Sequence, residues 1–248
     1  MSLKRIIPKI IVSDYDNSYD SEFVSILTKE YRFFRTIGNP LQQIKILESN
    51  HVDELLIILK SKADISGTFL KLIEEICANT STAITVGGGI KQATDVDSLF
   101  SLGIDRIILG RFRKNKALTS HIVSKHGSQA LIYSLDIDSQ ANKVPFKESI
   151  LNEINHLLQS GFGEISINDI SLDGSQKGLN LEALRLVLEH TRVPVTIGCG
   201  IGSIKDVENA LSLGASGVVL STFLAQKDQS PRQISAHLNA LNITTRKY

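Results

Sequence analysis

The feature that most constrains the fold is an internal repeat, in which two stretches of sequence align without a gap. Segment 84–110 reads ITVGGGIKQATDVDSLFSLGIDRIILG, and segment 195–221 reads VTIGCGIGSIKDVENALSLGASGVVLS. Gly87 and Gly198 stand 111 residues apart, as do Gly103 and Gly214. Each segment spells a short β-branched strand, a glycine turn, an amphipathic helix ending in Leu-Gly, and a second strand. This repetition predicts two related halves of one fold.

Bulk properties exclude several classes of protein. The net charge of +1 gives no electrostatic reason to expect nucleic acid or an anionic membrane as a partner. The two cysteines form no disulfide framework, so we expect a cytoplasmic protein. No 18-residue apolar window and no cleavable leader pattern are present, which argues against membrane insertion and secretion.

Apolar β-forming runs alternate with helical patterns along the chain. Strands are expected at 5–12, 54–59, 83–86, 106–109, 129–135, 164–168, 193–197 and 217–220. Helices are expected at 41–49, 67–79, 148–159, 181–190, 206–213 and 231–241, besides the one in segment 84–110. The polar stretch 13–40 is expected to be a long irregular loop, of a kind that often covers an active site.

Eight strand-then-helix units predict a parallel sheet, because each connection between parallel strands needs a crossover. In about 250 residues this number favours an α/β fold of the (β/α)8 TIM-barrel type, built from two similar half-barrels. We expect residues 1–248 to form a single barrel domain. An open flavodoxin-like sheet is the alternative, although five or six strands would suffice for it.

Glycine turns at the ends of the strands suggest phosphate binding, because they let backbone N–H groups approach an anion. Gly200, together with Ser221 and Thr222, matches the phosphate site that barrels often carry after strands seven and eight. Gly89 and Arg111 mark a weaker counterpart after strands three and four. The same glycines also suit tight turns without a ligand, and Arg111 could equally face solvent.

Asp136 stands where the fifth apolar strand ends, a position that suits a general acid or base. A solvated loop aspartate is the alternative. The six histidines and two cysteines show no metal-binding spacing, so we expect no metal site and no cofactor.

Several stretches resemble the cyclase subunit of imidazole glycerol phosphate synthase over nearly the whole chain. They are KRIIP, VDEL, TVGGGI, GSQA, the Asp173-Gly174 loop and the GAS…LST end. The resemblance implies a glutaminase subunit (HisH-like) docked at the N-terminal face of the barrel as a heterodimer. It implies that ammonia crosses the barrel to a bisphosphorylated substrate at the other face.

The resemblance also assigns residues. The charged gate for ammonia corresponds to Arg5, Glu54, Arg106 and Glu164, with Arg106 in place of a lysine; a structural ion-pair ring is a compatible reading. Asp105 matches an aspartate at the partner interface. One phosphate site is retained through Asp173, Gly174, Gly200, Ser221 and Thr222.

The reacting end departs from the family pattern. Asp136 matches one of two catalytic aspartates, but the other falls on Ile11, which has no proton to exchange, and Asp14 should point elsewhere. A further aspartate falls on Leu59, and an Asn-Thr phosphate pair falls on Gly110 and Arg111. This pattern resembles paralogues that act with a glutaminase and a sugar amidotransferase to convert acetamido to acetamidino groups on surface sugars.

Three functions therefore remain open at this stage. The first is an ammonia-channelling subunit in glutamine-dependent amidation of a phosphorylated or nucleotide-linked sugar. The second is the histidine-biosynthesis cyclase, a lyase. The third is a non-catalytic scaffold that docks and activates the glutaminase; a two-phosphate isomerase of a related family is more distant, since it also needs an acid on strand one.

Overall fold

The strands close into a barrel in the computed structural model, which describes residues 3–14, 23–60, 65–141 and 146–246. Parallel pairing runs from one strand to the next, and the last strand pairs with the first, Arg5 opposite Gly217. The barrel strands are β1 (Arg5–Ser13), β4 (Glu54–Leu59), β5 (Ala83–Gly87), β6 (Arg106–Leu109), β7 (Leu131–Ile137), β8 (Glu164–Asp169), β9 (Val195–Gly198) and β10 (Gly217–Leu220). The expected (β/α)8 barrel is confirmed.

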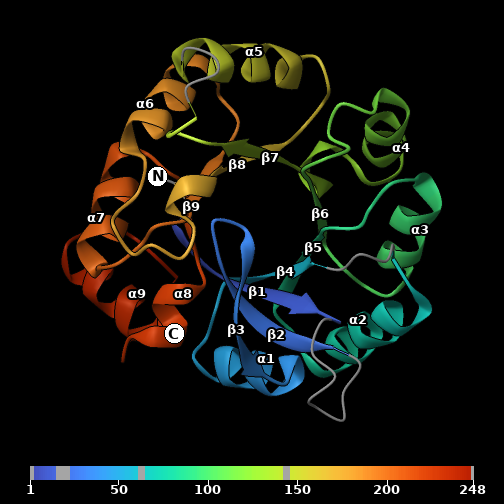
Figure 1. Ribbon diagram of the computed structural model, residues 1–248, viewed down its shortest axis with the longest axis horizontal. Helices are drawn as coiled ribbons and strands as arrows, with labels where there is room; N and C mark the ends of the chain where they lie inside the picture. Colours follow the sequence, from blue (N-terminus) through green and yellow to red (C-terminus); the bar gives the residue numbers. More distant parts are fainter. Residues whose placement is uncertain (1–2, 15–22, 61–64, 142–145, 247–248) are drawn as a thin grey trace.

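Helices surround this barrel (Figure 1). They are α1 (Pro40–Ser49), α2 (Gly67–Asn79), α3 (Ala93–Ser101), α4 (Lys116–His126), α5 (Phe146–Leu158), α6 (Leu181–His190), α7 (Ile204–Leu213), α8 (Thr222–Gln226) and α9 (Pro231–Ala240). Short 3-10 turns occupy Ser128–Ala130 and Ile170–Leu172. The first of these turns delays the start of β7 to Leu131, two residues later than expected.

The internal repeat corresponds to matching structural units in the two halves. Helices α3 and α7 begin at Ala93 and Ile204, which occupy equivalent places in the repeat. Each starts with a capping box, Gln92 with Asp95 in one and Ser203 with Asp206 in the other. Such reciprocal bonds satisfy backbone N–H groups at the start of a helix.

Alternation along the strands divides the apolar side chains between two compartments. Outward residues such as Ile6 and Ile10 join the main core between the barrel and its helices. Inward residues Ile7, Leu56, Ile108, Ile132 and Val219 pack together inside the barrel. Because both faces are buried, each strand reads as a continuous apolar run.

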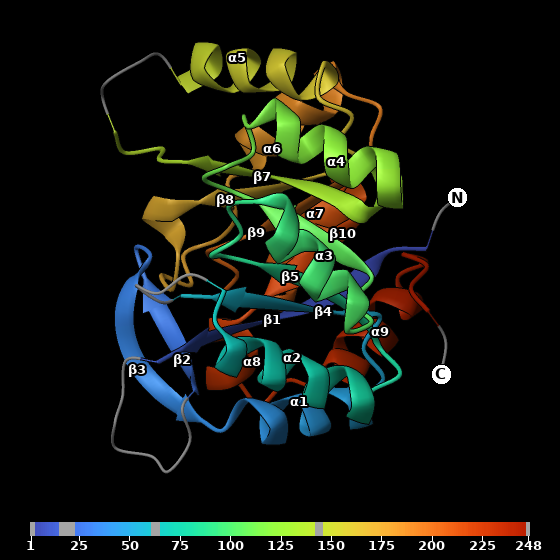
Figure 2. The ribbon, with the colours of Figure 1, turned by 90° about the vertical axis from the view of Figure 1, so that its right-hand side faces the viewer.

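The expectation of an irregular loop over 13–40 is wrong where the structure describes it. Strands β2 (Val24–Lys29) and β3 (Arg32–Gly38) form an antiparallel hairpin, and β2 also pairs with the end of β1. The hairpin lies over the barrel centre in Figure 1 and at the end opposite the chain termini in Figure 2. Residues 15–22 of the expected loop lie outside the described residues.

Helices α4 and α8 were not among the expected elements. The other helices and strands agree with expectation to within about two residues at their ends. No helix in the described ranges is long and apolar enough to cross a membrane.

Candidate active site and the two ends of the barrel

Four charged side chains form a closed ion-pair ring at the N-terminal end of the barrel. They are Arg5, Glu54, Arg106 and Glu164, the residues expected at the barrel floor. Arg5 donates to Glu54 at 2.9 Å and to Glu164 at 2.8 Å. Arg106 donates to Glu164 at 2.8 Å and also pairs with Glu54, so each arginine bridges both carboxylates.

Burial makes this ring electrostatically strong. The side chains of Glu54 and Glu164 are only 4% and 7% exposed. Burial alone would lower the pKa of Arg106, but the charges of the two glutamates and their hydrogen bonds raise it above its ordinary value. Thr85 adds a hydroxyl bond to Glu54 at 2.5 Å. Three of the apolar side chains inside the barrel, Ile7, Leu56 and Ile108, stand directly above the ring, because each follows a ring residue by two positions on the same strand.

Asp105 lies beside this end of the barrel and is exposed. Its carboxylate accepts the Ile84 N–H at 2.7 Å, and its own N–H donates to the Ile84 carbonyl at 2.9 Å. The residue therefore anchors the start of β5 while leaving part of its surface open to a partner.

A cavity of about 360 Å³ opens at the other end of the barrel. Four cationic side chains line it, Lys9, Lys60, Lys91 and Arg111, whereas Asp136 is the carboxylate among its described lining residues. Gly88, Gly89 and Gly110 form part of its wall. The cavity thus combines one candidate proton acceptor with a surface suited to anions. We refer to it as the mouth cavity.

Asp136 is held by two hydroxyl groups. Ser134 Oγ donates to its Oδ1 at 2.9 Å, and Tyr31 Oη donates to the same oxygen at 3.0 Å. Tyr31 comes from the hairpin tip, far from Asp136 in sequence. Burial raises the pKa of the Tyr31 hydroxyl well above its usual range, as do the negative charges near it, so the phenol remains a donor at neutral pH.

The hairpin tip is fixed over this cavity by several contacts. Glu30 and Tyr31 both have positive φ, 50° and 58°, the signs that a type I′ hairpin turn requires. The N–H groups of Glu30 and Tyr31 donate to the carbonyl and carboxylate of Asp173, at 3.2 and 3.1 Å. Lys60 donates to the Tyr31 carbonyl. These bonds stabilise a turn that lacks the usual asparagine or glycine.

The two positions where the resemblance expects carboxylates are apolar. Ile11 is 6% exposed, packs against Val24 and Ile26 of the hairpin, and also lines the mouth cavity. Leu59 lines the cavity too, and Gly89 fits closely against it: a Cβ at Gly89, where φ is +70°, would lie 3.1 Å from a Leu59 methyl. Neither side chain can move a proton.

The residues expected to hold a phosphate meet at a second, smaller cavity. Asp173, Gly174, Gly200, Ser221 and Thr222 line it, and its volume is about 20 Å³. That is room for roughly one water molecule. Two of its glycines are required by close backbone neighbours: a Cβ at Gly174 would lie 2.3 Å from the Thr28 carbonyl oxygen, and one at Gly200 would lie 2.1 Å from the Gly178 carbonyl oxygen.

Asp173 serves this region as a structural acceptor. Thr28 donates to its Oδ2 at 2.6 Å, and the Lys9 ammonium lies 3.9 Å from its Oδ1. The Cys199 thiol, 3.7 Å from Oδ1, has its pKa raised to about 12, chiefly by burial. Cys199 is therefore an uncharged thiol at neutral pH.

Three residues of the mouth cavity escaped sequence reasoning. Lys9 interrupts the apolar run RIIPKIIV, and counting in steps of two from Arg5 would have placed it inside the barrel. Lys60 follows β4 directly, and the same count from Glu54 would have placed it inside the barrel. Tyr31 carries no such signal, because its place depends on the hairpin. Among the described residues no group of three or more His, Cys, Asp or Glu side chains could hold a metal ion.

Comparison with known proteins gives one family. The sequence model described as "Histidine biosynthesis protein" matches residues 21–230. A Prochlorococcus marinus protein named "Putative imidazole glycerol phosphate synthase subunit hisF2" is 28% identical, with 99% of each chain covered. "Imidazole glycerol phosphate synthase subunit HisF" of Dictyoglomus thermophilum is 26% identical over 90% of each chain, and a Pseudomonas aeruginosa protein with the hisF2 name is 28% identical over 84% of each. The similarity therefore extends over both halves of the barrel.

Proposed function

The chain belongs to the family of histidine biosynthesis proteins, among its HisF-like members, and from that premise we propose that it delivers ammonia to a sugar. In this proposal it is the synthase subunit of a glutamine amidotransferase complex. A glutaminase partner docks at the N-terminal end of the barrel. Ammonia passes through the barrel to a phosphorylated or nucleotide-linked sugar at the mouth cavity.

The observation that carries the proposal is the contrast between the two ends of the barrel. At one end the ion-pair ring is complete, with four contacts between two arginines and two glutamates. At the other end Ile11 and Leu59 occupy the positions of the family's carboxylates. A site with one carboxylate suits the addition of ammonia better than a cyclisation that uses a pair of acids.

The relatives support a partner, because their names describe subunits of a synthase. The exposed Asp105 and the ring mark the face at which a glutaminase would dock. A sugar amidotransferase would meet the opposite face, where the hairpin lies.

The chemistry at the mouth would be the exchange of an acetamido oxygen for nitrogen. Ammonia adds to the carbonyl carbon, water leaves, and an acetamidino group remains. We infer that Asp136 takes a proton from the attacking nitrogen; the hydrogen bonds from Tyr31 and Ser134 to its carboxylate support this role. General-base assistance of this kind is worth about a hundredfold to ten-thousandfold in rate.

The test follows nitrogen from glutamine. The complex with its glutaminase and sugar amidotransferase is given glutamine labelled with ¹⁵N in its amide, together with nucleotide-linked acetamido sugars. We expect Glu54→Ala and Arg106→Ala to reduce incorporation of label, while added ammonium salt at high concentration restores product. Arg185→Ala, on the exposed surface of α6, is the control. Unchanged label transfer in both ring variants would contradict the proposal.

A second function, the cyclase of histidine biosynthesis, is favoured by the position of Asp136 in the mouth cavity and by the HisF relatives. Its test uses the purified chain, ammonium salt and the bisphosphorylated formimino-carboxamide ribonucleotide, whose loss is followed by absorbance. Turnover that Asp136→Asn abolishes would establish this function. A folded chain without turnover would rule it out, and a chain that only stimulates the glutaminase would be a scaffold.

A further inference from the structure

Lys9 places a positive charge inside the barrel that the proposed function does not use. By two-residue alternation on β1, its side chain follows Arg5 and Ile7 on the inward face and precedes Ile11. The side chain is only 10% exposed. It lines both the mouth cavity and the small cavity beside Gly200, so it forms part of the wall between them.

The ammonium group of Lys9 lacks hydrogen-bond acceptors among the described residues. Its acidic neighbour, Asp173 Oδ1, is 3.9 Å away, which is too far for a hydrogen bond. Asp173 does not depend on it, because Thr28 and the Tyr31 N–H already donate to that carboxylate. An ammonium carries three N–H donors, so an anion in the mouth cavity could accept a hydrogen bond from Lys9 without displacing a protein acceptor.

This ammonium keeps its charge despite burial. Burial alone would lower the pKa of Lys9, but negative charge at Cys199, Asp173 and Asp136 raises it above the ordinary value. Because the thiol of Cys199 is neutral near pH 7, the two carboxylates account for the effect there. Lys9 is therefore unsuited to act as a nucleophile and well suited to bind an anion.

The size and the lining residues of the cavities around Lys9 decide where an anion can bind it. The small cavity, at about 20 Å³, has room for little more than a water molecule. The mouth cavity, at about 360 Å³, has room for a phosphorylated group and carries further cations at Arg111 and Lys91. Lys9 also lines a third cavity of about 370 Å³, but of these three cavities only the mouth cavity is lined by both Lys9 and Asp136. An anion that binds Lys9 beside Asp136 therefore occupies the mouth cavity.

We propose that Lys9 binds a phosphoryl oxygen of the substrate at the inner wall of the mouth cavity. This inference rests on the proposed function for its substrate class, and it adds that the phosphate or diphosphate of the sugar points down into the barrel. The acetamido group then lies nearer the rim, within reach of Asp136. On β1 the family's catalytic aspartate is replaced by Ile11. Lys9, two residues earlier on that strand, supplies a charged side chain to the same cavity.

Binding of simple phosphates tests the inference without any partner protein. The purified chain is titrated calorimetrically with inorganic pyrophosphate and, separately, with inorganic phosphate at constant ionic strength. We expect Lys9→Met to weaken binding about tenfold to a hundredfold, which is the loss of one charge-assisted hydrogen bond. Lys71→Met, an exposed lysine on α2, should bind as the wild type does.

The two probes distinguish two sources of the same chemistry. If the Lys9 variant loses affinity for pyrophosphate alone, the substrate is a nucleotide diphosphate sugar. If it loses affinity equally for both probes, the substrate is a single phosphate ester. Should Lys9→Met fail to fold, Lys9→Gln, which keeps a polar side chain but removes the charge, serves in its place. Wild-type affinity in a folded Lys9 variant, or no binding to the wild type at millimolar probe, would overturn the inference.

The phosphate titration can fail independently of the nitrogen-labelling experiment that tests the proposed function. The titration needs no glutamine or glutaminase, whereas the labelling experiment needs no phosphate titration. Pyrophosphate binding that depends on Lys9, without transfer of labelled nitrogen, would leave the binding site intact and remove only the amidation role.

Discussion

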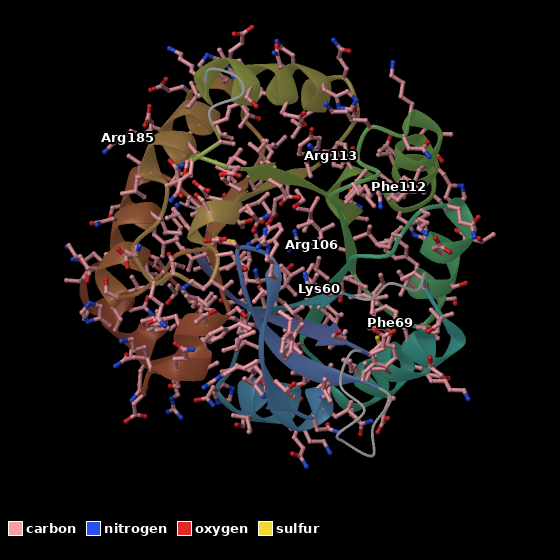
Figure 3. All side chains as sticks on the ribbon, viewed as in Figure 1. Lys60, Phe69, Arg106, Phe112, Arg113 and Arg185 are labelled. Atoms are coloured by element: carbon pink, nitrogen blue, oxygen red, sulfur yellow. The ribbon has the colours of Figure 1, made fainter. Side chains whose placement is uncertain are left out.

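Removing Arg106 from the ion-pair ring tests whether the ring stabilises the barrel as strongly as its geometry indicates. Arg106 makes two of the four ion pairs, and its loss leaves Glu54 and Glu164 to share Arg5. Figure 3 shows Arg106 within the barrel, whereas Arg185 lies on the outer side of α6.

The expected loss in the free energy of unfolding follows from the burial of the ring. Each charge-assisted hydrogen bond contributes about 1.5–3 kcal/mol, and breaking a buried ion pair on one side costs about 3–5 kcal/mol. Because the two glutamates are 4% and 7% exposed, water cannot replace Arg106 fully. We therefore expect Arg106→Met to lower the free energy of unfolding by about 3–5 kcal/mol.

The assay is urea denaturation followed by circular dichroism, with Arg185→Met as the matched control. The control should change the free energy of unfolding by less than about 0.5 kcal/mol, as exposed substitutions usually do. The double variant Arg106→Met/Glu164→Gln restores equal numbers of opposite charges and should recover at least half of the loss. A cost below about 1 kcal/mol for Arg106→Met, or no recovery in the double variant, would refute this reasoning.

Two further predictions concern the contacts around the mouth and outside the barrel. Gly174→Ala should destabilise the chain by about 2–4 kcal/mol, measured by urea denaturation. The reason is that φ is +70° and the new Cβ would lie 2.3 Å from the Thr28 carbonyl; Gly67→Ala, with open space around it, is the control and should be close to neutral. Glu153 has its pKa lowered to about 2, because hydrogen bonds from Lys114, Tyr133 and Arg113 outweigh the opposing effect of burial. A pKa below the unfolded value gives stability that is full above about pH 5 and is lost as the pH falls toward 2, so Glu153→Gln should cost about 2–3 kcal/mol at pH 7 and much less at pH 2. An equal cost at both pH values would show that the carboxylate charge is not responsible.

The barrel could be predicted from sequence because its signals are local and repeated. Each barrel strand is a short, largely apolar run, and most helices carry an apolar stripe, so most of the order of elements follows from periodicity. Helix α4 (KALTSHIVSKH) has a weak stripe and was missed for that reason. The ring was predictable for a related reason. Charged residues at the first position of β1, β4, β6 and β8 fall at the same level of a closed barrel.

The hairpin could not be predicted in the same way. Its turn consists of Glu30 and Tyr31, neither of which favours positive φ, so the usual sequence signal of a tight hairpin is missing. What holds the turn is distant in sequence: the carboxylate and carbonyl of Asp173, and the ammonium of Lys60. The contact between Tyr31 and Asp136 depends on the same tertiary bonds, and so does the apolar packing that explains Ile11.

The two ends of the barrel are far enough apart to change independently. Arg5 and Ile11 are six residues apart on β1, which at about 3.3 Å per residue is a separation of about 20 Å. Sites separated by more than about 7–10 Å without shared partners contribute additively to stability. The ring can therefore keep its four ion pairs whatever occupies the mouth, and in the proposed function it bears on the nitrogen supply rather than on the acceptor. In the same proposal the acceptor is selected by the mouth cavity, which Lys9, Tyr31 and Asp136 line from β1, the hairpin tip and β7. Experiments on substrate identity should therefore vary these three residues, and experiments on partner binding should vary the ring and Asp105.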